Sequence, residues 1–253
     1  MGKKDERNIR FYKTNQNMIK DKDFYNRESS HYSSKRYPRS ASTYVQYFFK
    51  KRLESVLNLL ENILEGKNNL DLLEIGCADG IVVREISNRM GGAFSSFVGI
   101  DTAEDMIKTA ESLNTSTDAR FFVRGSEPSN KMYDVIIEIG VANYTDFEAE
   151  MRYASEHMKE NGTYILSIAG SDSSNKIFGR GIGYQNFLLY SEYELIIGKL
   201  FKIDSVIPVG LYFPLIWTVP VLGRAIQTVM ETFVRPMAPD LFHEKVYVLY
   251  SKS

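Results

Sequence analysis

Residues 72–80 read Leu-Leu-Glu-Ile-Gly-Cys-Ala-Asp-Gly, and this stretch decides the fold. An apolar run stops at an acid, and two glycines then lead the chain into a segment whose apolar residues recur at helical spacing. Glycines let the backbone approach a ligand closely, and the helix that follows presents unpaired N–H groups to a polar or anionic group. The stretch therefore predicts a strand, a ligand-binding turn and a helix.

Strand and helix patterns alternate around this turn. They predict strands at 71–75, 97–100, 120–123, 133–139 and 163–168, with helices at 81–90, 103–113 and 147–159. A helix from a cap at 42–43 to Gly66 comes before them, and a helix at 191–200, a strand at 201–206, an amphipathic helix near 221–235 and a strand at 245–250 come after. Strands that alternate with helices of about 10–15 residues predict an α/β fold with a parallel, doubly wound sheet.

A second polar feature comes at the end of the next strand. Asp101 stands there, where a carboxylate can accept both hydroxyls of a ribose. Because open α/β sheets bind ligands at the carboxyl ends of their strands, we expect Asp101 and the turn at 76–80 to share one crevice. The turn lacks the G-x-G-x-x-G dinucleotide fingerprint, and its Asp79 would repel a pyrophosphate. The pattern favours a ligand that carries an amino group and no phosphate.

With these residues the sequence resembles the class I S-adenosylmethionine-dependent methyltransferases. Residues 74–80 match the family motif E/D-x-G-x-G-x-G, with Ala78 at the middle glycine, and the element order matches over about residues 42–253. The resemblance implies a Rossmann-like seven-stranded sheet that ends in an antiparallel strand pair, and S-adenosylmethionine as the cofactor. It implies that Asp101 binds the ribose. The other cofactor-binding candidates are Tyr37, Glu74, Gly76, Cys77, Ala78, Asp79, Gly80, Thr102, Met106, Ser126, Glu127 and Ile139.

The chain departs from the family after the third strand. An aspartate usually holds the adenine amino group there, whereas this chain has Ser126 followed by Glu127. In the implied reaction the donor methyl group is already activated, so the protein supplies proximity, alignment and, for a hydroxyl or ammonium nucleophile, a proton acceptor. The candidate acceptors are His31, Tyr144 and His243.

Motifs that the sequence lacks exclude some classes of methyl acceptor. No Asn/Asp-Pro-Pro-aromatic run of base methylation follows the fourth strand, and no paired-glutamate loop or metal triad is apparent. We therefore expect neither a metal nor a nucleic-acid partner. Three functions stay open: methylation at O or N of an apolar or lipid-linked small molecule, methylation of a sugar or natural product with a dimeric enzyme, and a non-catalytic regulatory protein that binds S-adenosylmethionine.

Charge and cysteine content indicate the class of protein and its cellular compartment. The 253 residues carry 31 Lys and Arg against 32 Asp and Glu with one cysteine, which is typical of a globular protein in the reducing cytoplasm. Residues 1–52 hold 14 basic and 5 acidic side chains. We expect residues 1–41 to form a basic, helical arm that closes as a lid over a methyltransferase domain at 42–253.

An uncharged run at 205–223 contains Pro208, Pro214 and Pro220. Prolines at this spacing would break a membrane-spanning helix. The run belongs to an apolar insertion at 206–242, before the last strand. Exposing so many apolar side chains is costly, so the insertion covers the core or a greasy substrate, or residues 207–235 contact a membrane surface or a second copy in a homodimer.

Overall fold

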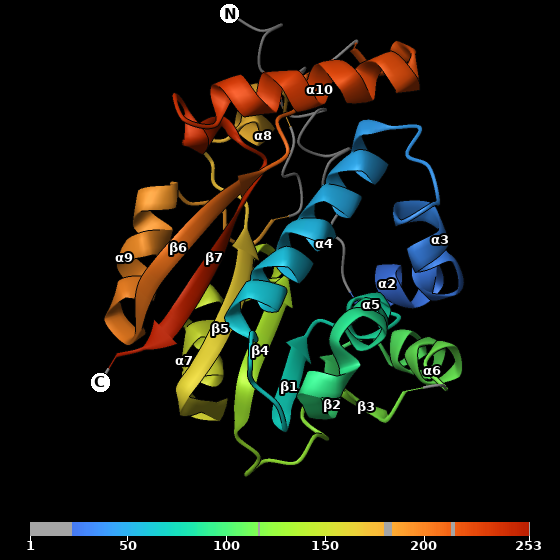
Figure 1. Ribbon diagram of the computed structural model, residues 1–253, viewed down its shortest axis with the longest axis vertical. Helices are drawn as coiled ribbons and strands as arrows, with labels where there is room; N and C mark the ends of the chain where they lie inside the picture. Colours follow the sequence, from blue (N-terminus) through green and yellow to red (C-terminus); the bar gives the residue numbers. More distant parts are fainter. Residues whose placement is uncertain (1–21, 116, 180–183, 214–215, 253) are drawn as a thin grey trace, which may run out of the picture.

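A seven-stranded sheet forms the centre of the protein. The computed structural model describes residues 22–115, 117–179, 184–213 and 216–252, so residues 1–21 of the predicted arm and Pro214 lie outside the described residues. Along the sheet the strand order is β3-β2-β1-β4-β5-β7-β6 (Figure 1). The strands are β1 (Leu70–Ile75), β2 (Phe94–Asp101), β3 (Ala119–Val123), β4 (Tyr133–Ile139), β5 (Met158–Ile168), β6 (Phe201–Val209) and β7 (Glu244–Ser251).

The first five strands run parallel, and β7 runs antiparallel to both of its neighbours. Helices cover both faces, as the alternating pattern predicts. α4 (Tyr44–Ile63), α5 (Ile81–Met90) and α6 (Glu104–Leu113) pack on one face, whereas α7 (Phe147–His157) and α9 (Tyr190–Leu200) pack on the other. Neighbouring β1 residues show the two layers, because Leu72 enters one core and Leu73 the other. The structure confirms the predicted fold class.

The described part of the N-terminal arm is helical. It consists of α2 (Lys22–Glu28), a 3₁₀ turn η2 (Ser29–His31) and α3 (Tyr32–Arg36). α2 lies beside α6: Lys22 Nζ is 2.8 Å from Glu104 Oε1, and the Asp105 N–H donates to Asn26 Oδ1 at 3.0 Å. These contacts place the arm over the β2 side of the sheet.

Several predicted boundaries differ from the structure by a few residues, and two of these differences have a clear cause. The helix predicted at 147–159 ends at His157, because Met158 already pairs with Tyr133 at the start of β5, before a register shift. The strand predicted at 201–206 continues to Val209 through Pro208, which pairs with Lys245. β6 is an edge strand, where the missing N–H of a proline leaves no ladder bond unmade.

The apolar insertion folds across one end of the molecule. Its elements are η5 (Ile216–Thr218), the long helix α10 (Pro220–Val234) and η6 (Pro239–Leu241), and the short helix α8 (Ser174–Ile177) lies near them in the view (Figure 1). Trp217 packs against Tyr47 of α4 with the ring centroids 5.3 Å apart. Among the described helices, none combines the length and the apolar character that crossing a bilayer requires.

Candidate active site

The turn after β1 has the backbone conformation that its glycines allow. Gly76 and Gly80 have φ of 70° and 72°, and Ala78 between them has φ of 48°. The Gly76 N–H donates to Ile100 O at 2.7 Å, which ties the turn to β2. A Cβ added to Gly76 would collide with Val141. Position 76 therefore needs glycine both for its φ and for the close approach of the loop after β4.

Asp101 joins two backbone turns. Its Oδ2 accepts the Ala78 N–H at 3.0 Å, and its Oδ1 accepts the Ala103 N–H at 2.8 Å. Burial raises the pKa of the carboxyl, and the backbone N–H groups act against that rise. Each oxygen keeps a lone pair for a further donor. The ends of β1 and β2 thus meet at one place, as the sequence predicts.

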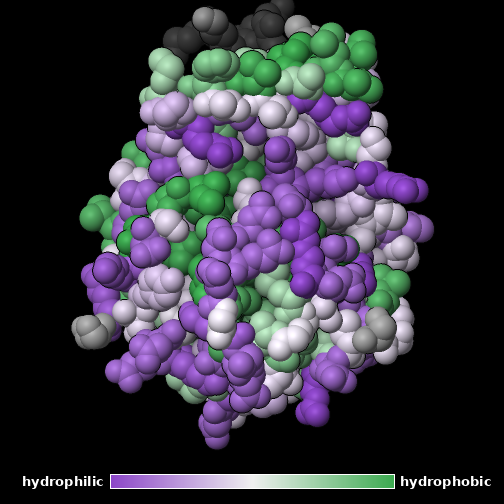
Figure 2. Space-filling view, viewed as in Figure 1, coloured by the Kyte–Doolittle hydropathy of each residue, from purple (hydrophilic) through white to green (hydrophobic). Residues whose placement is uncertain are grey.

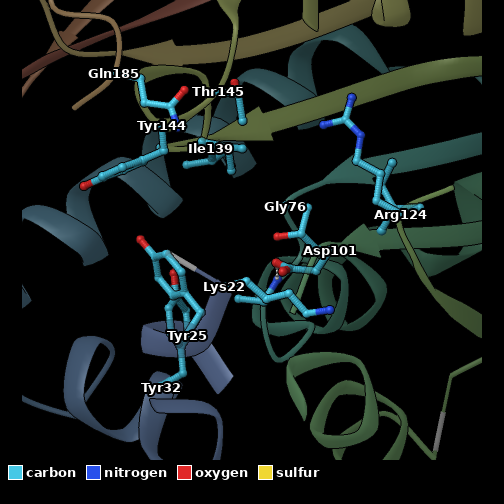
Figure 3. A pocket seen from close by; sticks show the side chains of 15 residues that line it. Lys22, Tyr25, Tyr32, Gly76, Asp101, Arg124, Ile139, Tyr144, Thr145 and Gln185 are labelled. Atoms are coloured by element: carbon cyan, nitrogen blue, oxygen red, sulfur yellow. Dashed lines mark hydrogen bonds between the residues drawn. The ribbon is translucent and has the colours of Figure 1, made fainter. Parts of the chain in front are cut away.

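A cavity of about 410 Å³ lies at the carboxyl ends of β1, β2 and β4. Six of the predicted site residues line it: Gly76, Ala78, Asp101, Thr102, Ile139 and Tyr144. Figure 3 shows Asp101 beside Gly76, with Tyr25 and Tyr32 reaching in from the arm and Tyr144 approaching from the opposite wall. The cavity is therefore built from the sheet on one side and from the arm on the other.

Four predicted residues lie in or under the turn without lining the cavity. Cys77 is buried, a Cβ on Gly80 would meet Asn114 Nδ2 at 2.5 Å, and Met106 packs beneath Ala78. Glu74 is buried, and burial raises its pKa well above the usual range. Its Oε2 has no hydrogen-bond partner among the described residues.

Asp79 connects the turn to the arm. Its Oδ2 accepts the Ser33 N–H at 3.0 Å and also the Ser33 hydroxyl. Its Oδ1 is buried without a partner in the described part of the chain. The acid that argued against a pyrophosphate therefore also holds α3 against the turn.

Three predicted cofactor residues lie away from the cavity lining. The Tyr37 ring packs on Phe49 at 5.6 Å. Ser126 is exposed and donates to Val123 O, and Glu127 accepts bonds from the Gly125 N–H and the Tyr153 hydroxyl. After β3 the cavity is lined instead by Arg124, which the sequence reasoning missed.

Of the three candidate proton acceptors, Tyr144 alone lines the cavity. Its hydroxyl shares a hydrogen bond with Tyr25, and burial raises the pKa of Tyr144. His31 is exposed at the end of η2. His243 is buried, stacked on Phe48 at 4.2 Å, with its Nδ1 3.1 Å from the Tyr44 hydroxyl. The structure therefore brings neither histidine to the cavity, and the tyrosine there is neutral.

A buried ion pair supports the wall beside β4. Arg52 Nη1 donates to both oxygens of Glu244, at 2.9 and 3.0 Å. Ser167 Oγ donates to Glu244 and accepts the Gly140 N–H at 2.9 Å, and a Cβ on Gly140 would collide with Arg52. The sequence held one signal for this arginine: position 52 follows Phe48 by four residues, on the apolar face of its helix.

Comparison with known proteins agrees with the fold and the position of the cavity. A family described as "Methyltransferase domain" matches residues 36–195. The chain belongs to this family. The match confirms the resemblance seen in the sequence, and its residue range contains every predicted cofactor-binding residue. In the described residues, no group of histidine, cysteine and acidic side chains is placed to hold a metal ion.

The curated relatives are O-methyltransferases. This chain is similar to malonyl-[acyl-carrier protein] O-methyltransferase of Bacillus anthracis, with 27% identity over 148 residues, 56% of this chain and 54% of the relative. It is also similar to the protein of that name from Acetivibrio thermocellus, with 25% identity over 182 residues, 70% of this chain and 58% of the relative. The chain thus spans little more than half the length of these relatives.

Solved structures share the fold at low identity. Magnesium protoporphyrin IX methyltransferase of Synechocystis PCC 6803, solved with bound S-adenosylhomocysteine, superposes with a TM-score of 0.64 at 15% identity, over 91% of this chain and 98% of that one. The N-methyltransferase NodS of Bradyrhizobium japonicum WM9, also solved with S-adenosylhomocysteine, gives a TM-score of 0.56 at 12% identity, over 81% and 88%. These likenesses concern the fold.

Proposed function

We propose that this chain transfers a methyl group from S-adenosylmethionine to an oxygen of an apolar or lipid-linked small molecule. One observation carries the proposal: the Gly76 turn and Asp101 meet in a cavity at the carboxyl ends of the strands. When bound, the cofactor supplies a methyl group that its sulfonium has already activated. The methyltransferase family of the chain and the O-methyltransferase relatives support this assignment.

The residues present fit such a cofactor. Asp101 has lone pairs left for the ribose hydroxyls, and Gly76 presents bare backbone to the cavity that it lines. Beneath the cavity lining, two buried carboxyl oxygens of the turn, Glu74 Oε2 and Asp79 Oδ1, lack partners among the described residues, which leaves acceptors for a donor group of the ligand. We assign the rest of the cavity wall to the cofactor through Ala78, Thr102 and Ile139, with the adenine toward Arg124.

The ionisable groups around the cavity favour an acceptor that is already ionised. No histidine occurs among the described lining residues, and the Tyr144 hydroxyl stays neutral because burial raises its pKa. The lone pairs that the backbone N–H groups leave on Asp101 are assigned to the ribose hydroxyls, so that Asp101 does not face the acceptor. A carboxylate acceptor needs no proton acceptor, because it attacks the methyl group as an anion. We therefore propose methyl ester formation, in agreement with the relatives' name.

The arm and the insertion complete the proposal. We propose that residues 1–41 form a lid on the domain at 42–253, with Tyr25 and Tyr32 facing the cavity. We also propose that the insertion at 206–242, which adds no residue to the described cavity lining, borders the path by which the substrate enters. The place of action is the cytoplasm or a membrane surface that faces it. For residues 207–235 the proposed partners are that surface or a second copy of the chain.

Calorimetry with S-adenosylhomocysteine tests the cofactor site. We expect the wild-type protein to bind it and Asp101→Ala to bind about tenfold more weakly or worse, because a charge-assisted hydrogen bond is lost. Asp204→Ala is the matched control, since Asp204 is an exposed aspartate on the edge strand β6, and it should bind as the wild type does. Absence of binding by the wild-type protein, or unchanged affinity in Asp101→Ala, would refute the assignment.

The acceptor is tested with S-adenosylmethionine carrying a tritiated methyl group. The protein is incubated with a small-molecule and lipid extract, and the labelled product is then treated with base. A methyl ester releases volatile labelled methanol, whereas an N-methyl or ether product keeps its label. Base-stable product would contradict a carboxylate acceptor and leave the cofactor assignment intact. Binding without any transfer would favour the regulatory alternative.

A further inference from the structure

Helix α10 packs with the reverse of the usual polarity. Its buried residues are Gly223, Gln227 and Glu231, spaced four apart on one stripe. Large apolar side chains lie on the outside, with Val229 55% exposed and Phe233 69% exposed. A surface helix of a globular protein normally turns its apolar stripe toward the core and its polar residues toward water. Specific contacts must therefore hold α10 in this orientation, and its apolar side is left facing outward.

Buried hydrogen bonds hold the helix in this orientation. Glu231 Oε1 accepts the Leu211 N–H at 3.1 Å and the Gln227 amide at 2.8 Å, and its Oε2 accepts the Tyr47 hydroxyl at 3.1 Å. The Gln227 amide also donates to Leu211 O. At Gly223 an added Cβ would lie 2.7 Å from Ile216 O, so the backbones are in contact there. Rotating the helix to bury its apolar side would break this whole network.

The exposed side forms a continuous apolar surface, which we call the α10 face. Its members are Val219, Val221, Leu222, Val229, Phe233 and Met237, each at least 55% exposed. Figure 2 shows a green, hydrophobic band across the end of the molecule where Figure 1 places α10. Single exposed apolar residues are ordinary, but a band along a whole helix marks an interaction surface.

Cations line the flank between α10 and α4. The two hollows on that side are lined by Arg39, Lys50, Lys51, Arg224 and Arg235. None of these five forms an ion pair with another described residue. The two acids that line the hollows are engaged, because Glu231 is buried in the network above and Glu54 is 2.7 Å from Arg89.

We propose that the α10 face lies in the interface of an anionic bilayer, with its basic flank on the lipid phosphates. An amphipathic helix with apolar side chains on one side and cations beside them binds such a surface by burial and by charge. A second copy on the same face would bring its own five cations and no free acid from the two hollows, so the basic flank would gain no counter-charge, whereas lipid phosphates would supply one. The charge pattern therefore selects the bilayer over a second copy.

The bilayer would meet the protein at its substrate end. In Figure 1 the arrowheads of β1, β4 and β5 point toward the end of the molecule that carries α10. The cavity lies at those strand ends, so a lipid-linked acceptor would approach it from the docked side. This last step rests on the proposed function, whereas the docking itself does not.

Vesicle flotation with the full chain tests the docking. We expect binding to vesicles of phosphatidylcholine with phosphatidylglycerol, weaker binding to phosphatidylcholine alone, and loss of the difference at high salt. Val229→Glu/Phe233→Glu should lower the bound fraction by about tenfold or more, because each change removes an apolar anchor. Leu195→Glu, on a residue of α9 that is 74% exposed, is the matched control and should bind normally. Lys51→Glu/Arg235→Glu should lose the preference for anionic vesicles.

Each outcome decides the question. Absence of flotation, equal flotation of the Val229→Glu/Phe233→Glu variant, or equal flotation on neutral and anionic vesicles overturns the docking. A wild-type dimer in sedimentation that this variant converts to monomer overturns it in favour of a homodimer interface. S-adenosylhomocysteine binding, measured on the same samples, shows that each variant is folded, because α10 does not line the cavity. Flotation without that binding would refute the proposed function alone, and binding without flotation would refute the docking alone.

Discussion

Arg52→Met should strongly destabilise the protein, because Arg52 lies on the buried side of α4. Arg52 and Glu244 have side chains that are only 5% and 4% exposed, and two charge-assisted hydrogen bonds join them. Methionine keeps the length and the apolar contacts but leaves the Glu244 carboxylate buried without its cation. Breaking a buried ion pair in this way costs about 3–5 kcal/mol, a large share of the roughly 5–15 kcal/mol that stabilises a domain. Urea unfolding followed by circular dichroism measures the loss.

Two further variants identify the cause. Arg52→Met/Glu244→Met removes both charges, so most of the lost stability should return, because an apolar pair costs no desolvation of ions. Arg89→Met breaks the pair with Glu54, whose side chains are 33% and 50% exposed, and should cost about 0–1 kcal/mol. The reasoning is refuted if Arg52→Met lies within about 1 kcal/mol of wild type, or if the double variant is no more stable than the single one.

Three other outcomes follow from the site. Gly76→Ala should bind S-adenosylhomocysteine about tenfold more weakly or worse in calorimetry, because the new Cβ meets Val141 and displaces the turn. Gly66→Ala is the control, since Gly66 has a similar φ of 74° and nothing within 4 Å of an added Cβ. It should bind normally and lose only about 1–2 kcal/mol of folding stability. Burial raises the pKa of Glu138 from 4.5 to about 8. Between these two pH values the free energy of unfolding of the wild-type protein should therefore fall relative to that of Glu138→Gln. If urea titrations give a stability difference between the two proteins that does not change with pH, this prediction is wrong. Tyr144→Phe should keep methyl transfer within about tenfold, since a neutral phenol is no proton acceptor, and a loss beyond about a hundredfold in kcat would assign it that role.

The sequence pattern alone predicted the strands of the sheet and the two features at the centre of the site, the turn at Gly76 and Asp101. Apolar runs and helical spacing predicted the elements because their spacing reflects burial on one or both faces. The meeting of Gly76 and Asp101 followed from the rule that ligands bind at the carboxyl ends of parallel strands. The strand predicted at 201–206 stopped short of Pro208 and Val209, which pair with β7; the sequence does not show that this strand lies at an edge, where a proline is tolerated.

Long-range contacts account for what the sequence could not predict. The burial of Arg52 depends on Glu244, 192 residues further along the chain. Tyr25 and Tyr32 reach the cavity because the arm docks on the turn after β1, where Ser33 forms hydrogen bonds to Asp79. For α10 the pattern predicted an amphipathic helix, but only the bonds of Glu231 to Tyr47 and Leu211 show which side faces the protein.

The place of β7 in the sheet has a consequence for synthesis on the ribosome. β7 is made after β5 and β6, yet it lies between them and is the sole strand that pairs with β6 in the described sheet. Until β7 emerges, the nascent chain carries β6 with an unmade ladder and Arg52 without Glu244. A chain that stops early thus exposes an unpaired strand edge, the kind of surface through which incomplete chains aggregate. Synthesis of β7, rather than growth of the strands before it, completes the sheet.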